Sequence, residues 1–171
     1  MSSYQFLASD HPFEKLENPF LERLSIREAL ERNMDIPAFM LENPDMDPEE
    51  KIVLICDTEE HLEDLELHPE EISFPEVSAR LTENPYVVEL QWCYNKERAE
   101  TLLGYIKKHL TSAENLEIFS LWLDEEDPPQ RMEVTLDCLN LSHLSFLDLS
   151  EGYQGPKCLH VINTHTALKE S

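Results

Sequence analysis

The stretch that decides the fold is residues 86–123, which reads YVVELQWCYNKERAETLLGYIKKHLTSAENLEIFSLWL. Its two ends, 86–93 and 116–123, are mostly apolar and predict two strands. Between them lies a helical repeat of apolar residues, which predicts an amphipathic helix over about residues 96–110: Ala99, Leu102, Leu103, Ile106 and Leu110. Asn95 is placed to cap this helix. The stretch therefore predicts a strand, a crossover helix and a parallel neighbouring strand.

Further strands are predicted on both sides of this unit, at residues 4–8, 52–56, 131–138 and 158–162. The 131–138 run alternates polar and apolar residues, which is typical of a strand with one face on the core. The 52–56 run is continuously apolar, and this pattern is typical of a strand buried on both faces. Ser25 and Glu28 match a capping box, which predicts a helix from about residue 26 to residue 33.

We therefore predict an α+β fold: a mixed sheet with helices mainly on one face. From residue 86 onward the order is strand, helix, strand, strand, short helix, strand, which is the ferredoxin-like succession. In that fold the second strand lies at a sheet edge, whereas residues 116–123 are apolar on both faces apart from Glu117 and Ser120. Either the 52–56 strand pairs beside it or the strand order differs.

The length of 171 residues predicts a single α+β domain over 1–171, with an acidic, irregular excursion at 41–83 and a frayed tail at 164–171. No apolar run approaches the length of about 18 residues that a membrane span needs. The N-terminal residues lack the pattern of a secretory signal. Four cysteines stand singly in apolar runs, which is typical of reduced thiols, so we expect a cytoplasmic protein without membrane contact.

Charge is the strongest compositional signal. The chain holds 36 acidic and 13 basic residues, a net charge of −23. Residues 41–70 contain twelve Asp and Glu and one Lys. Such a field repels nucleic acid and anionic lipid and attracts basic proteins. The predicted partner-binding residues lie in two acidic groups: Glu59, Glu60, Glu63 and Asp64 in the first, and Asp124, Glu125, Glu126 and Asp127 in the second.

Common catalytic signatures are missing from the sequence. Only three glycines occur, so no glycine-rich phosphate loop is present, and no Gly-x-Ser-x-Gly turn exposes a nucleophile. Catalytic residues stay unassigned, and no cofactor is predicted.

Three groups of residues could hold a metal or carry acid/base chemistry. One is Cys158, His160 and His165 with Cys138 and His143, if their strands are neighbours. Another is His61 and His68 among carboxylates. The third, residues 43–47, resembles the start of a calcium loop but lacks the glycine and the final glutamate. Each group could instead have a purely structural role: the thiols could fill the core, the histidines could lie at strand ends, and the carboxylates could form a solvated surface.

These observations favour an acidic protein-binding module, of the inhibitor, immunity or antitoxin kind, whose partner is a basic protein. The alternative from another class is a small metal-assisted hydrolase that uses Cys/His or His/carboxylate groups. A third possibility is that the charge serves only solubility. The acidic segment also has an internal partner to consider, the basic outer face of the 96–110 helix. The oligomeric state stays open.

Overall fold

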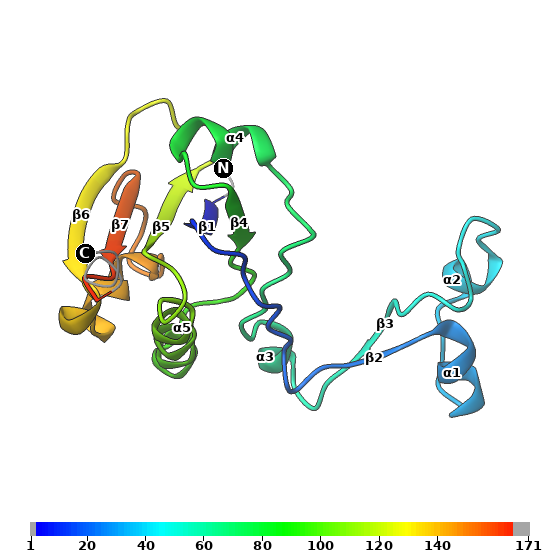
Figure 1. Ribbon diagram of the computed structural model, residues 1–171. Coiled ribbons are helices and arrows are strands. Elements are labelled where there is room, and N and C mark those ends of the chain that lie inside the picture. Colours follow the sequence, from blue (N-terminus) through cyan, green and yellow to red (C-terminus); the bar gives the residue numbers. More distant parts are fainter. Residues whose placement is uncertain (1–2, 166–171) are drawn as a thin grey trace. The chain divides into compact units, whose positions relative to one another are not determined.

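The computed structural model of the protein describes residues 3–165 (Figure 1). The elements follow one another in this order: β1 (Ser3–Ser9), β2 (Glu22–Leu24), α1 (Ile26–Glu31), α2 (Ala38–Glu42), β3 (Val53–Ile55), α3 (Glu59–Leu62), α4 (Pro75–Leu81), β4 (Tyr86–Glu89), α5 (Lys96–His109), β5 (Asn115–Trp122), β6 (Gln130–Thr135), the 3-10 helices η1 (Leu136–Cys138) and η2 (Leu141–Leu147), and β7 (Lys157–Ile162). Most of the tail predicted at 164–171 lies outside the described residues.

The chain divides into two compact units. One, here called the sheet unit, consists of Met1–Glu17 and Leu65–Ser171; the other, here called the inserted unit, is Asn18–Asp64. The sheet unit holds a five-stranded sheet, and the inserted unit holds the two-stranded sheet of β2 and β3 with α1, α2 and α3. The single domain with an excursion over 41–83 stays a prediction. The inserted unit shares only residues 41–64 with that excursion.

The five strands of the sheet unit lie in the order β4-β1-β5-β7-β6. β1 is antiparallel to both β4 and β5, β5 is antiparallel to β7, and β6 runs parallel to β7. The sheet is therefore mixed, and the predicted α+β class is confirmed.

The strand-helix-strand unit at 86–123 forms as β4, α5 and β5. Asn95 caps α5 as predicted, because its side-chain oxygen accepts a hydrogen bond from the backbone N–H of Arg98 at 2.8 Å. The prediction that the two strands are neighbours is wrong, since β1 lies between them and Leu7 is opposite both Val88 and Ile118. β5 is buried along most of its length, and buried backbone groups need hydrogen-bond partners, which a paired strand on each side supplies. β1 is also largely buried and apolar, and it fills the position between β5 and β4.

The ferredoxin-like succession of elements from residue 86 onward is present, with η1 and η2 in the place of the short helix. Its second strand, β5, is nevertheless central rather than at an edge. Of the two explanations for the apolar 116–123 run, a different strand order is therefore the right one. The 52–56 run pairs elsewhere, with β2.

Both faces of the sheet are covered by apolar packing. On one face, α5 and η2 contribute Leu102, Ile106 and Leu144 to a core that includes Ile118 and Leu159. On the other face, a second cluster is covered by residues in and beside α4: it consists of Tyr4, Phe6, Ala8, Phe119, Leu121 and Cys158, with Phe74, Val77 and Leu81 packed against it. The longest helix and the 3-10 turns thus share one face, and α4 covers the other.

The predicted double burial of the 52–56 strand is wrong. β3 pairs with β2 alone, and 46% of Leu54 is exposed, while Val53 and Ile55 are only half-buried. The physical reason is that little apolar surface covers this strand: among the described residues, the buried hydrophobic ones of the inserted unit are Leu24, Ile26 and Ala29.

His109 joins the end of α5 to β1. Its ring Nε2 lies 2.8 Å from the Oγ of Ser9 and the ring stacks on Phe13, with centroids 4.4 Å apart. Ser9 is fully buried and also donates a hydrogen bond to the Asn115 carbonyl at 2.8 Å. The pair is therefore a structural contact rather than an exposed nucleophile with its base.

Burial, and next the neighbouring His11, lower the pKa of His109 below 6.5. Between the folded and the unfolded pKa, only the unfolded chain binds the extra proton, so stability rises with pH in this window. The free energy of unfolding of the wild type should therefore fall more steeply from about pH 7 to pH 5 than that of His109→Gln. Urea denaturation at several pH values measures both slopes, and parallel curves would contradict this account.

Candidate functional site

The eight predicted partner-binding residues are divided between the two units. Glu59 and Glu60 begin α3, Glu63 is its C-cap and Asp64 follows, all in the inserted unit. Asp124–Asp127 connect β5 to β6 in the sheet unit. Most of the eight are exposed, and Asp64 and Glu125 are half-buried.

The 124–127 loop is tied to the sheet unit. The carboxylate of Glu125 accepts a hydrogen bond from the Tyr153 hydroxyl at 3.1 Å, and its backbone carbonyl accepts one from Arg80 at 3.1 Å. Tyr153 in turn stacks on Trp122, with ring centroids 4.6 Å apart. Burial raises the pKa of Tyr153 to about 12, and Glu125 adds to the rise. One carboxylate of this loop, that of Glu125, therefore already has a hydrogen-bond partner within the sheet unit.

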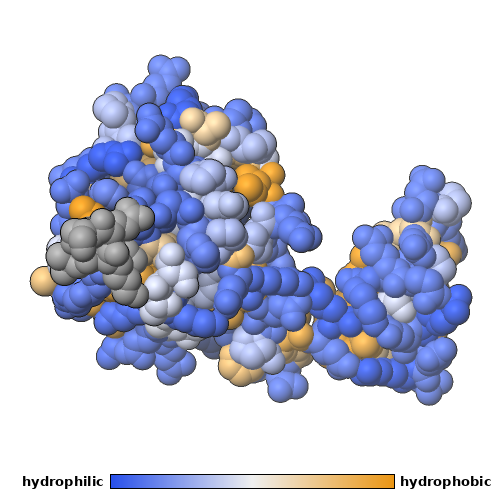
Figure 2. Space-filling model, in the orientation of Figure 1, coloured by the Kyte–Doolittle hydropathy of each residue, from blue (hydrophilic) through white to orange (hydrophobic). Residues whose placement is uncertain are grey.

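The inserted unit exposes apolar and acidic side chains together. It contains fourteen Asp and Glu against four Arg and Lys. Among the described residues, seven large hydrophobic side chains are exposed, and six of them belong to this unit: Phe20, Leu30, Phe39, Leu41, Leu54 and Leu62. Figure 2 shows hydrophobic residues at the surface of this unit among hydrophilic ones. Within the described residues, the exposed large hydrophobic side chains are therefore concentrated in the inserted unit.

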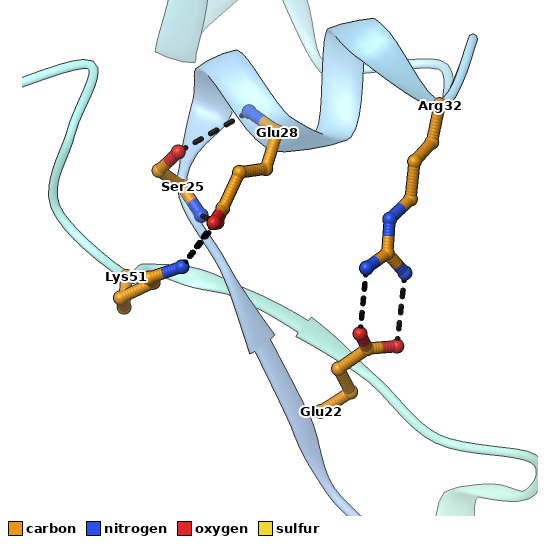
Figure 3. Close-up of polar contacts among 5 residues, drawn as sticks. All are labelled: Glu22, Ser25, Glu28, Arg32 and Lys51. Atoms are coloured by element: carbon orange, nitrogen blue, oxygen red, sulfur yellow. Dashed lines mark hydrogen bonds and ion pairs between the residues drawn. The ribbon is translucent and has the colours of Figure 1, made fainter.

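Polar contacts link α1 and the residues at its ends to β2 and to the segment that precedes β3 (Figure 3). The predicted capping box is confirmed, because Glu28 N–H donates to the Ser25 hydroxyl at 3.2 Å and the Ser25 N–H donates to the Glu28 carboxylate at 2.8 Å. Lys51 also binds the Glu28 carboxylate. Arg32 makes a two-pronged ion pair with Glu22, at 2.8 and 3.1 Å.

These ion pairs shift the acid/base equilibria of the carboxylates but contribute little stability. Hydrogen bonding from Lys51 lowers the pKa of Glu28, and hydrogen bonding from Arg32 lowers that of Glu22. All four side chains are largely exposed, and exposed ion pairs are weakened by water and salt. The inserted unit thus combines a small core with exposed polar contacts, a combination typical of a weakly stable part of a protein.

The candidate metal ligands are scattered. Cys158 is buried, and burial raises the pKa of its thiol to about 12, whereas Cys138 is exposed and does not fill the core. His165 faces the Asp137 carboxylate at 3.0 Å, and His143 accepts the Asn140 N–H. Within residues 3–165, three or more His, Cys, Asp or Glu side chains are nowhere grouped as a metal site. The described part of the chain thus brings together no ligand set for the metal-assisted hydrolase.

The pair His61 and His68 and the calcium-like turn have local roles. His61 stacks on Phe20 in the inserted unit, with centroids 4.4 Å apart, and His68 lies 2.8 Å from the Glu66 carboxylate in the sheet unit. In the turn at 43–47, the Asn43 side chain accepts the N–H of Asp45 at 3.0 Å. Asp47 accepts the N–H of Glu49 in the same way, at 2.9 Å. These two side chains therefore stabilise their own turns.

The basic face of α5 is partly occupied within the sheet unit. Arg98 is buried and donates to the Cys93 carbonyl at 2.8 Å, and Lys108 pairs with Glu14 at 2.6 Å. These two cations therefore have partners from the sheet unit itself.

A buried carboxylate in the centre of the sheet was missed as a candidate. Glu117 of β5 accepts hydrogen bonds from Arg131 at 2.9 Å, from Asn84 at 3.0 Å and from the Thr82 hydroxyl. It lines a cavity of about 810 Å³, together with His160 and Asn163. The available signal was the single Glu within the apolar 116–123 run. Since both carboxylate oxygens are already hydrogen-bonded, this residue is a structural anchor of the cavity wall rather than a free base.

Comparisons with known proteins identify no similar protein. No family model matches the chain, and neither the curated proteins nor the solved structures contain a match. Across residues 3–165, every helix is too short or too polar to cross a membrane. Any functional assignment therefore depends on the geometry above.

Proposed function

We propose that the protein is an acidic protein-binding module whose inserted unit captures a basic partner protein. One observation carries the proposal: the unit that exposes six large hydrophobic side chains also holds fourteen acidic residues against four basic ones. Apolar contacts supply affinity, while the negative field speeds encounter with a positively charged surface.

The same charge pattern limits the kind of partner. A net charge of −23 repels the phosphates of nucleic acids and the anionic surface of membranes. Inhibitor, immunity and antitoxin roles fit this physics because they require rapid capture of a basic protein. The cytoplasm is the proposed compartment, and four unpaired thiols support it.

Charge removal at the two acidic groups tests the proposal. We expect the quadruple variant Glu59→Gln, Glu60→Gln, Glu63→Gln and Asp64→Asn to slow association with the partner by about tenfold at low salt. The matched variant Asp124→Asn, Glu125→Gln, Glu126→Gln and Asp127→Asn removes the same formal charge. It should have a smaller effect, because the 124–127 loop belongs to the sheet unit, which among the described residues exposes one large hydrophobic side chain against six in the inserted unit.

The measurement has two stages. Tagged protein captures partners from lysate, mass spectrometry identifies them, and each purified candidate is then tested for direct binding by surface plasmon resonance. The proposal predicts an identified partner with a basic isoelectric point, whose association slows as salt rises. If neutralising residues 59, 60, 63 and 64 leaves the association rate unchanged, the acidic surface is only solubilising.

A further inference from the structure

β3 has one edge without a neighbouring strand. It pairs with β2 in the register Glu22↔Ile55, Arg23↔Leu54 and Leu24↔Val53, and these two strands form the whole of their sheet. Its other edge therefore presents backbone N–H and C=O groups to which no described strand binds. Such an edge is a template for another extended chain.

The sequence of β3 does not protect this edge. Proteins usually guard exposed edges with charged residues, proline, bulges or very short strands. β3 is short, at three residues, but the 52–56 run Ile-Val-Leu-Ile-Cys contains no charged residue and no proline. Lys51, the cation just before the strand, is bound to Glu28. A two-stranded ribbon is marginally stable by itself, so pairing with a third strand would add ladder hydrogen bonds and cover apolar side chains such as Leu54.

The charge around β3 selects the occupant. Exposed carboxylates stand at both ends of the strand, Glu50 before it and Asp57 after it. A second copy of the chain would bring the same fourteen acids and four bases to the edge and be repelled. An extended segment with Lys or Arg among apolar residues can form hydrogen bonds with the free backbone groups of β3, and its positive charge is attracted by the surrounding carboxylates.

We propose that the basic partner adds an extended segment to the free edge of β3 as a third strand. This rests on the proposed function, because it specifies how the inserted unit holds a basic protein. In this mode, main-chain hydrogen bonds supply affinity and alternate side chains supply specificity.

Synthetic peptides test the pairing directly on the full chain. The probe is a peptide of about ten residues that alternates lysine and valine. Its controls are the same peptide with every backbone nitrogen methylated, and a helical lysine/leucine peptide of equal charge. We expect the alternating peptide to slow hydrogen exchange at residues 53–55 and to bind about tenfold more tightly than either control.

Two protein variants complete the experiment. Leu54→Lys and Leu30→Lys make the same change at similar exposure, 46% and 48%, but only Leu54 lies on the strand. Leu54→Lys should weaken binding of the alternating peptide by about tenfold more than Leu30→Lys does. Equal binding of the methylated or the helical peptide would overturn strand addition while leaving charge-driven capture intact. If no peptide binds, strand addition is also wrong, and the association assay above still decides the proposed function by itself.

Discussion

Phe119→Ala is expected to lower the free energy of unfolding by about 3–5 kcal/mol. Phe119 is fully buried in β5 and stacks on Phe6 of β1, with ring centroids 4.5 Å apart and planes tilted by 12°. It also lies opposite Cys158 of β7, so the ring belongs to a row that crosses three strands. The truncation leaves a cavity between strands and covering helix that the paired sheet cannot close.

The matched control is Phe39→Ala in the inserted unit, where 68% of the residue is exposed. This change should stay within about 0.5 kcal/mol of the wild type. Urea denaturation followed by far-UV circular dichroism measures both, because this signal reports the helices and strands of the sheet unit and of the inserted unit alike. Equal losses for the two variants would mean that the Phe6–Phe119 stack is not the centre of this face.

Glu117→Ala is expected to cost about 2 kcal/mol of folding free energy. Its carboxylate is the shared acceptor for the Thr82 hydroxyl, the Asn84 amide and the Arg131 guanidinium. Removing it leaves partly buried donors unsatisfied. Arg131 contributes the smaller share, because half of its side chain is exposed and water can replace the carboxylate there.

Two further variants make this prediction sharp. Glu117→Gln keeps an acceptor oxygen and should lose less stability than Glu117→Ala. Glu133→Ala removes a carboxylate from β6, the strand beyond β7, where 71% of the side chain is exposed, and should stay within about 0.5 kcal/mol of the wild type. Thermal or urea unfolding ranks the three. A loss for Glu133→Ala as large as that for Glu117→Ala would refute the anchoring role.

The candidate site could be located from sequence only in part. The run of acids at 41–70 pointed to a charged surface, and most of that run lies in the inserted unit. The exposed apolar side chains that accompany it, Phe39 and Leu41 among them, could not be recognised, because an apolar residue carries no sign of whether a layer will cover it. Glu117 was visible as an exception in an apolar run, yet its partners come from two distant segments, Thr82 and Asn84 from the connection between α4 and β4 and Arg131 from β6.

The sequence by itself determined the elements whose signals are local. The spacing of Ala99, Leu102 and Ile106 and the cap at Asn95 specify α5, and Ser25 with Glu28 specifies the start of α1. The existence of β1 and of β3 to β7 was equally local, although the alternating 131–138 run ends as a strand at Thr135 and continues as the η1 turn. The short strand β2 was not predicted.

Only the tertiary structure decided which strands pair. Tyr86–Glu89, Asn115–Trp122 and the 52–56 run all have the composition of sheet strands, and no local rule says which of them shares an edge. β1 enters between β4 and β5 from the far end of the chain, leaving β3 with β2 alone. Pairing is a competition among distant segments for buried positions, and it left the most apolar strand of the inserted unit with an open edge.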